Sequence, residues 1–377
     1  MLVVREILVV FFIFILSRLF VLFGVFFGLR FISAPQATAA GVINYKQWWL
    51  SLLQYDTGFY LSVINEGYNF VNDGVGVYNT IIFPLYPLSV RYLAIFFSAD
   101  VVMTGLILSN ACFLVALVIL FYYVKGHYKD VDPTLSVILM SVFPSGVIFS
   151  TMYAESLFLL LAVVSFYMFY EKRYIPASLA LSLLGATKLQ GLFVLPSLAL
   201  PYLIKLVFPL SNKRLKTDPN GVFRFLGWLT VSLTGVIAFG IYLKLRFGFW
   251  NAFILAQQYG WHRKIGDWAR LLTELKPDPN IIMHIVPAFI ILTSAIVFMF
   301  TKNYRRYVLW GLCTVLIPLS SGSFLGMNRY MIVYFPMVIF ISGLSNRSVY
   351  VRDFFVAMFF TGSFVTTVIY TKGYFLG

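Results

Sequence analysis

The sequence predicts an all-α, polytopic membrane helix bundle of about 10–12 helices. Of its 377 residues, 60% are hydrophobic and only 11% are charged, whereas a soluble globular protein is closer to half apolar and a quarter charged. Aromatic residues make up 19% of the chain, which is more apolar surface than a soluble core of this size could bury. Long apolar runs recur along the whole chain without the alternation that marks strands.

A spanning helix needs roughly 20 apolar residues. Clear candidates by that criterion are residues 6–30, 101–124, 134–150, 153–170, 190–209, 223–245, 282–301, 307–325, 329–345 and 353–371. The first run has no small-residue cleavage site behind a short apolar region, so we expect a retained helix rather than a signal peptide. Segments 81–98 and 175–187 are apolar but short or interrupted, and the first contains Pro84, Pro87 and Arg91.

The net charge of +14 comes from short basic clusters between apolar runs. Such clusters are typical of cytoplasmic loops, and nucleic acid is not expected as a partner. The clusters are Lys125 to Lys129, Glu171 to Arg173, Asn212 to Lys216, Lys302 to Arg306 and Arg347 to Arg352. We therefore predict one domain, residues 1–377, with extracytoplasmic loops at about 31–80 and 246–280. If residues 1–5 are cytoplasmic and 31–80 are outside, residues 81–124 must cross the membrane an odd number of times. Segment 81–98 is then a partial or interfacial helix, or one of these side assignments is wrong.

The residue inventory excludes several kinds of chemistry. Cys112 and Cys313 lie in apolar runs without metal-ligand spacing, and His127, His262 and His284 are scattered. We expect no metal, no cofactor and no disulfide framework. Nucleotide-driven chemistry and a Ser-His-Asp triad are also unexpected, because no Gly-rich loop follows a strand and histidines are few.

The outward segments contain most of the unusual polar residues. Asp56 lies in the run Gln54 to Tyr60, with Glu66 nearby, and the alternative is a solvated carboxylate in an aromatic belt. Glu155 follows Phe143-Pro144-Ser145 and Tyr153, and the alternative is an acid that favours a helix N-terminus.

Three further outward segments contain cations. Lys188 interrupts an apolar region, which makes it a functional candidate, and the alternative is a structural pairing with Glu155. Arg263 follows Gln258 and Trp261, a combination suited to a phosphate and a sugar ring or to snorkelling at lipid headgroups. Arg329 opens a late helix and either binds a phosphate or marks the helix boundary.

These segments, taken in order, resemble the PIG-V class of mannosyltransferases, which act in GPI-anchor assembly and have prokaryotic relatives. The resemblance rests on short matching motifs between residues 55 and 330. They are Tyr55-Asp56 to Tyr60, Glu66-Gly67-Tyr68, Phe83-Pro84 to Leu88, Phe143-Pro144-Ser145, Tyr153-Ala154-Glu155-Ser156-Leu157-Phe158, Gln258 to Arg263, and Arg329-Tyr330. The chain departs from the family at Tyr55, where the family has Trp, and at Lys188, where it has Arg.

The resemblance implies a GT-C fold and an inverting transfer of a hexose, with mannose as the expected sugar. The donor would be a polyprenyl- or dolichyl-phosphate sugar, and the acceptor a glycolipid or glycan at the non-cytoplasmic face. The implied base is Asp56, because inverting chemistry needs a carboxylate opposite the leaving group. The expected donor-phosphate residues are Lys188, Arg263, Arg329 and Gln258, and the expected acceptor or sugar residues are Glu66, Tyr60, Tyr153, Glu155 and Trp261.

Two other classes of function remain open from sequence. A transporter or lipid flippase would use intramembrane charges such as Lys188 and Arg91, although no repeat between the halves is visible. A membrane scaffold or chaperone would tolerate changes in the charged loops. The expected location is the plasma membrane for a prokaryotic chain and the endoplasmic reticulum for a eukaryotic one, and the acceptor is left open.

Overall fold

The computed structural model describes residues 2–32, 45–207, 219–274 and 279–373, and every regular element in these ranges is helical. The α-helices are α1 Leu2–Phe31, α2 Thr57–Asn65, α3 Leu85–Phe96, α4 Val101–His127, α5 Pro133–Ser141, α6 Glu155–Tyr170, α7 Tyr174–Thr187, α8 Val194–Val207, α9 Pro219–Phe247, α10 Ala252–Trp261, α11 Trp268–Glu274, α12 Pro279–Phe300, α13 Val308–Leu319, α14 Met327–Val333, α15 Pro336–Ser345 and α16 Val349–Thr371. Short 3-10 helices are η1 Tyr45–Leu52, η2 Asn79–Ile81, η3 Gly146–Ser150, η4 Leu189–Phe193 and η5 Arg305–Tyr307.

The chain is an integral membrane protein built from helices of unequal length. Within the described residues, five helices are long and apolar enough to cross a membrane: Val3–Phe31, Val101–His127, Val222–Phe247, Ile282–Phe300 and Val349–Thr371. The pair α14 and α15 forms a further span if counted together, bent by 63° at its break. Short helices such as α2, α3 and α11 bring the number of elements above the number of spans.

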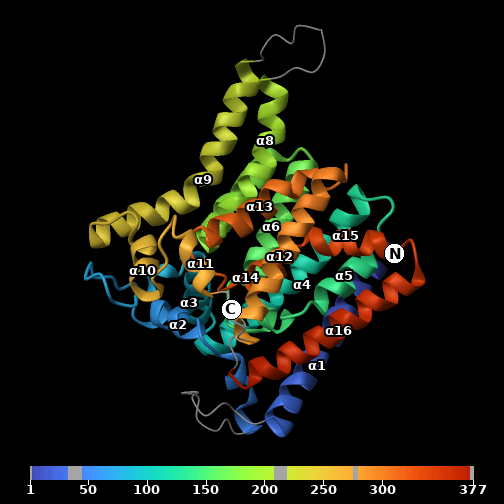
Figure 1. Ribbon diagram of the computed structural model, residues 1–377, viewed down its shortest axis with the longest axis horizontal. Coiled ribbons are helices and arrows are strands. Elements are labelled where there is room, and N and C mark those ends of the chain that lie inside the picture. The colour runs from blue at the N-terminus through green and yellow to red at the C-terminus, as the bar shows by residue number, and fades with distance from the viewer. Residues whose placement is uncertain (1, 33–44, 208–218, 275–278, 374–377) are drawn as a thin grey trace.

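The helices pack into one bundle around a continuous core (Figure 1). Helices α1 and α16 run side by side along one edge, and α8 and α9 rise together from the body. Glycines on α1 permit its close approach to α16: a Cβ at Gly24 would lie 2.9 Å from the Thr367 side chain, and one at Gly28 3.0 Å from the Val368 carbonyl. The early and late parts of the chain therefore form one wall of the bundle.

Local signals fix where the helices on the path to the site begin. Asp100 caps α4 by accepting a 2.9 Å hydrogen bond from the Met103 amide. Asp132 caps α5 in the same way, with Pro133 at the first helical position. An N-cap side chain of this kind satisfies one of the amides that have no partner within the helix.

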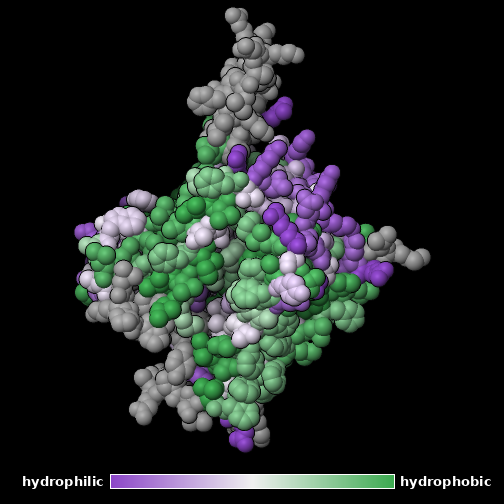
Figure 2. Space-filling model, turned by 45° about the vertical axis from the view of Figure 1, so that its right-hand side comes forward, coloured by the Kyte–Doolittle hydropathy of each residue, from purple (hydrophilic) through white to green (hydrophobic). Residues whose placement is uncertain are grey.

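Several of the predicted basic clusters meet at one end of the bundle. Arg306 stacks over the rings of Tyr170 at 4.2 Å and Tyr128 at 5.5 Å. The Asn346 side chain donates to the Asp130 carbonyl at 2.8 Å. This contact brings the segment before α16 to the same end of the bundle. Figure 2 shows hydrophilic side chains gathered in one region and hydrophobic ones over most of the remaining coloured surface. The cluster Asn212 to Lys216 lies outside the described residues.

The prediction of a continuous span at 134–150 is wrong. Helix α5 ends at Ser141, and Ser145 adopts a left-handed conformation with φ of 66° before η3 begins. Pro144 cannot donate a helical hydrogen bond, which favours the break. Arg18 on α1 donates to the Ser141 carbonyl at 2.9 Å, so a cation satisfies one of the acceptors exposed by the early helix end. The span predicted at 307–325 is also shorter, because α13 ends at Leu319.

The segment 81–98 contains a short helix that does not cross the bundle. Helix α3 has 12 residues, a length of about 18 Å that falls short of the ~30 Å hydrocarbon core. Glu6 and Lys125 pair at 2.5 Å, so the start of α1 lies beside the end of α4 and the two helices are antiparallel. Helix α3 therefore starts and ends on the same side, in agreement with a partial helix.

The two long polar segments predicted as loops are partly helical. Residues 45–81 contain η1, α2 and η2, and residues 252–274 contain α10 and α11. These short helices give the side chains near the end of α1 and after α9 defined positions, which an irregular loop would not.

Candidate functional site

The charged residues singled out from distant parts of the chain meet around the Arg329 guanidinium. Its Nε donates to Glu155 Oε1 at 2.5 Å, and its Nη1 donates to Asp56 Oδ2. Lys188 Nζ donates to the same Glu155 oxygen at 2.7 Å. Glu155 is fully buried, Arg329 is nearly so, and Asp56 keeps a quarter of its side chain exposed. The structural pairing that was the alternative for Lys188 is therefore present, and it forms part of a larger network.

The elements around this network hold the charged groups in place through neutral contacts. Asp56 directly precedes α2, and its backbone amide donates to the Tyr153 hydroxyl at 3.2 Å. The same hydroxyl donates to the Gln54 carbonyl at 2.9 Å. The Tyr153 ring lies below Arg329, 4.7 Å from ring centroid to guanidinium carbon, a separation typical of cation–π contacts. Tyr153 thus positions both members of the Asp56–Arg329 pair.

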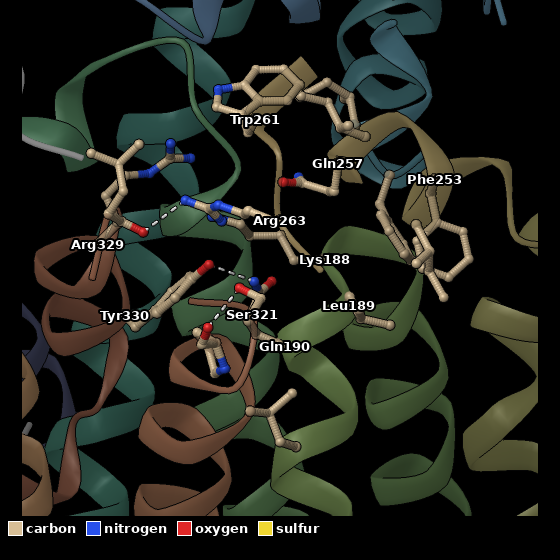
Figure 3. Close-up of a pocket in the computed structure, with 18 of the residues that line it drawn as sticks. Lys188, Leu189, Gln190, Phe253, Gln257, Trp261, Arg263, Ser321, Arg329 and Tyr330 are labelled. Atoms are coloured by element: carbon tan, nitrogen blue, oxygen red, sulfur yellow. Dashed lines mark hydrogen bonds between the residues drawn. The ribbon is translucent and has the colours of Figure 1, made fainter. Parts of the chain in front are cut away.

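A pocket of about 250 Å³ opens beside the network. Its lining includes Asp56, Lys188 and Arg329, together with Trp261 at the end of α10 and Arg263 just after that helix. Figure 3 shows Trp261, Gln257 and Arg263 on one side of this space and Gln190, Tyr330 and Ser321 on another. The pocket therefore combines a carboxylate, three cations and aromatic rings, contributed by segments from all parts of the chain.

Hydrogen bonds fix several pocket residues. Arg263 donates from Nη2 to the Leu325 carbonyl at 3.0 Å. Gln190 Nε2 donates to the Tyr330 hydroxyl at 2.9 Å. The Trp261 ring packs against Phe59, with 5.6 Å between centroids. These contacts link η4 to α14, α10 to α2, and the segment after α10 to the segment after α13, so the pocket walls support one another.

The predicted site residues fall into three groups by position. Asp56, Tyr60, Lys188, Trp261, Arg263 and Arg329 line the pocket. Glu155 and Tyr153 lie buried behind its wall and do not face it. Glu66 is exposed at the end of α2, and Gln258 is half-buried on α10, and neither lines the pocket.

Sequence reasoning missed some lining residues. Gln257 lines the pocket in place of its neighbour Gln258, because one residue further along an α-helix turns a side chain by about 100°. Ser321 and Ile265 also line it, and no sequence signal marked them. The rotation of α10 about its axis thus determines which of its side chains line the pocket.

The charges of the network balance, and one cation adds to them. Asp56 and Glu155 carry two negative charges opposite the positive charges of Arg329 and Lys188. Arg263, also on the pocket, is bonded to a backbone carbonyl rather than to a carboxylate in the contact described above. The lining thus has a surplus of positive charge, which suits an anionic ligand. Among the described residues, no group of three His, Cys, Asp or Glu side chains could hold a metal ion.

A second, almost wholly apolar groove of about 420 Å³ adjoins the first pocket. Its walls come from α9, with Val236, Ile237 and Ile241, and from Trp250 before α10. Phe253 lines both spaces. Phe253 is thus shared by a pocket that contains charged side chains and by an apolar groove.

The segment between α2 and η2 has its own acid, Asp73, which does not line the pocket. Its carboxylate accepts hydrogen bonds from the Tyr78 hydroxyl and from the amides of Val75 and Gly76. These bonds, that of Tyr78 foremost, lower the pKa of Asp73, and the same bond raises the pKa of Tyr78 to about 12. Asp73 therefore orders an exposed turn and is not part of the pocket.

Comparison with known proteins finds likeness in structure and none in sequence. No protein-family model matches the chain, and no curated protein matches its sequence. Similar solved structures include the oligosaccharyltransferase of Archaeoglobus fulgidus tethered with an acceptor peptide, with a TM-score of 0.48, 10% identity, and coverage of 98% of this chain and 55% of that one. Its apo form has a TM-score of 0.46 and 10% identity, with coverage of 96% of this chain and 56% of that one. Its complex with an inhibitory peptide and a dolichol-phosphate has a TM-score of 0.40 and 10% identity, with coverage of 94% of this chain and 55% of that one. The chain spans about half the length of these proteins.

Proposed function

We propose that this chain is an inverting glycosyltransferase of the GT-C type, acting as a single domain over residues 1–377. It moves a hexose, with mannose the sugar named by the motif resemblance, from a polyprenyl-phosphate sugar to a lipid-linked or glycan acceptor. One observation carries the proposal: Asp56, Lys188, Arg263 and Arg329, far apart in sequence, line one pocket. A carboxylate that can take a proton thereby lies beside cations that can hold a phosphate.

The proposed reaction balances in charge. The acceptor oxygen forms a bond to the anomeric carbon as the bond from that carbon to the phosphate oxygen breaks. The phosphate leaves with the electron pair of the broken bond and gains negative charge. The proton of the acceptor hydroxyl passes to Asp56 as general base, which removes one negative charge from the network. The surplus positive charge of Arg329, Lys188 and Arg263 then faces the departing phosphate.

The apolar groove supports a lipid-linked donor. A polyprenyl-phosphate sugar has a charged head and a long apolar tail, and the two spaces that share Phe253 match these two parts. Trp261, beside the cations, offers a ring face for the sugar. A free nucleotide sugar would have no use for the apolar groove.

The geometry also supports a non-cytoplasmic site. Helix α6 runs from Glu155, in the charged network, to Tyr170, which contacts Arg306 at the basic end. Those residues are separated by about 23 Å along the helix, most of a membrane thickness. If the basic end is cytoplasmic, the pocket opens near the opposite face.

Reconstitution tests the proposed reaction directly. The purified chain in lipid nanodiscs would be given radiolabelled mannosyl-phosphopolyprenol and a glycolipid extract, without any ion gradient. We expect label to leave the lipid phosphate and appear in a glycolipid or glycan, with free polyprenyl phosphate as the second product. Label that stays on the lipid phosphate under these conditions would contradict the proposal. Movement of intact donor between the leaflets of liposomes would instead identify a flippase.

A further inference from the structure

Glu155 is buried, charged and not accounted for by the reaction as written. It is fully inaccessible to solvent and does not line the pocket, so it cannot contact a sugar or an acceptor. One of its oxygens, Oε1, accepts hydrogen bonds from both Lys188 and Arg329. Among the described residues, the other oxygen, Oε2, is buried and has no hydrogen-bond partner. A buried carboxylate oxygen without a hydrogen bond is costly, so in this arrangement Glu155 retains an unused acceptor beside two cations.

The position of Arg329 suggests what the unused oxygen does. The guanidinium is shared between Glu155 and Asp56, so the proposed base is held by the same group that should face the phosphate. When Asp56 takes a proton, its attraction for Arg329 falls. Arginine can bind both oxygens of one carboxylate in a planar fork, and Glu155 has its second oxygen available for this.

We propose that Glu155 is a positioning residue for the glycosyl transfer: it holds Lys188 and Arg329 through one oxygen and takes Arg329 onto both oxygens as Asp56 is protonated. This inference rests on the proposed function. When Asp56 is protonated, the Arg329 guanidinium shifts toward Glu155, so its positive charge keeps a carboxylate partner. Lys188 stays on Oε1 and keeps its charge at the pocket edge. Glu155 thus allows Asp56 to act as a base without leaving a buried cation unpaired.

The decisive variant is Glu155→Gln, which keeps the shape of the side chain and removes its charge. We expect kcat to fall about 100-fold, the scale of a small misplacement of reacting groups, with a smaller change in KM for the donor. Glu155→Asp should recover part of the loss, because it restores the charge on a shorter stem. The matched control is Glu171→Gln, at the other end of the same helix and exposed, which should keep wild-type kcat.

A double variant separates positioning of Arg329 from charge balance with Lys188. Lys188 itself lines the pocket, so the reference is the single variant Lys188→Met. We expect Glu155→Gln combined with Lys188→Met to have a kcat well below that of Lys188→Met alone, because Arg329 still lacks its second carboxylate. Equal kcat values for the double variant and Lys188→Met would overturn the proposal and make Glu155 only a counter-ion for Lys188. A folded Glu155→Gln protein with wild-type turnover would overturn it as well. If Glu155→Gln does not fold, wild-type turnover of Glu155→Asp has the same consequence.

A labelling experiment tests the inference without relying on transfer. Carbodiimide modification of Asp56 can be followed by mass spectrometry in the whole protein. In Glu155→Gln, Asp56 is the carboxylate partner that Arg329 keeps among the described residues, so modification of Asp56 should slow several-fold relative to wild type. An unchanged rate would overturn the inference. Absence of transfer by the wild-type protein would contradict the proposed function alone, so the two failures are distinguishable.

Discussion

Arg18 and Arg329 are both arginines buried in apolar helices, with 9% and 8% of their surfaces exposed. Each guanidinium also stacks on an aromatic ring, Phe113 at 4.8 Å for Arg18 and Tyr153 at 4.7 Å for Arg329. Their hydrogen-bond acceptors differ. Arg18 donates to serine hydroxyls and to the Ser141 carbonyl, whereas Arg329 donates to two carboxylates. Within the described residues, no carboxylate lies within ion-pair distance of Arg18.

This difference separates a structural cation from a candidate functional one. Arg18 joins α1 to the broken segment after α5 and does not line the pocket. Arg329 lines the pocket and pairs with two acids, to which the proposed mechanism gives roles. A buried charge in a membrane protein is a functional candidate by default, but its partners and its access to a cavity decide which role it has.

Removing the proposed base, Asp56, should give the largest effect on activity. Asp56→Asn keeps a partner of the same size for Arg329 but cannot accept the acceptor proton, so turnover should fall about 10²- to 10⁴-fold. The measurement is initial-rate transfer from mannosyl-phosphopolyprenol by protein of verified melting temperature. Asp353→Asn, exposed near the start of α16, is the control and should keep full turnover. Wild-type turnover of Asp56→Asn would show that the carboxylate paired with Arg329 has no catalytic role. The site of Arg329 would then be no more functional than that of Arg18.

Removing the paired arginine should give the largest loss of stability. Arg329→Met leaves Asp56 and Glu155 without their shared cation, and breaking a buried ion pair from one side costs about 3–5 kcal/mol. Denaturation by graded sodium dodecyl sulfate in mixed micelles measures this loss. A change of less than 1 kcal/mol would show that the network does not depend on Arg329.

The arginine with neutral partners should be easier to replace. Arg18→Met removes hydrogen bonds to neutral groups and leaves no carboxylate unpaired, so the free energy of unfolding should fall by only about 1–3 kcal/mol. Turnover per folded molecule should stay at the wild-type level. The same detergent denaturation, run beside Arg329→Met, gives the comparison. A loss of turnover without loss of folded protein would place Arg18 in the functional machinery.

The smallest effect is expected at the exposed turn of Asp73. Its pKa is lowered in the folded protein, so the order that Asp73 gives the turn is complete above the ordinary aspartate pKa and is lost as pH falls through the lowered value. Hydrogen-exchange protection of the Val75 and Gly76 amides should therefore fall in acid. Asp73→Asn should lower this protection at neutral pH and abolish its acid dependence, with no change in turnover. Protection independent of pH in the wild type would contradict this account.

The sequence was sufficient to predict the helical membrane class and several pocket residues. Composition alone requires lipid as the solvent for most side chains. Lys188 stands out because it interrupts an apolar region, whereas Asp56, Arg263 and Arg329 stand out by the polar and aromatic motifs in which they lie. Each of these four lines the pocket.

Other features could not be predicted because they depend on register and packing. Gln257 rather than Gln258 lines the pocket, a choice that the rotation of α10 makes. The burial of Glu155 behind the wall follows from how α6 packs, which its neighbours in sequence do not reveal. The early end of α5 depends on the Ser145 backbone and on Arg18 from a distant helix. The mean hydropathy of a segment does not reveal such a break in a helix.

The bend between α14 and α15 makes the guanidinium of Arg329 sensitive to residues that never touch it. Helix α14 is only seven residues long, and Pro336 begins the next helix after a turn of 63°. A substitution that straightened this joint would swing α14 as a lever and carry the guanidinium away from both acids. Loss of the charged network can thus begin in the apolar interior, at a joint outside the pocket.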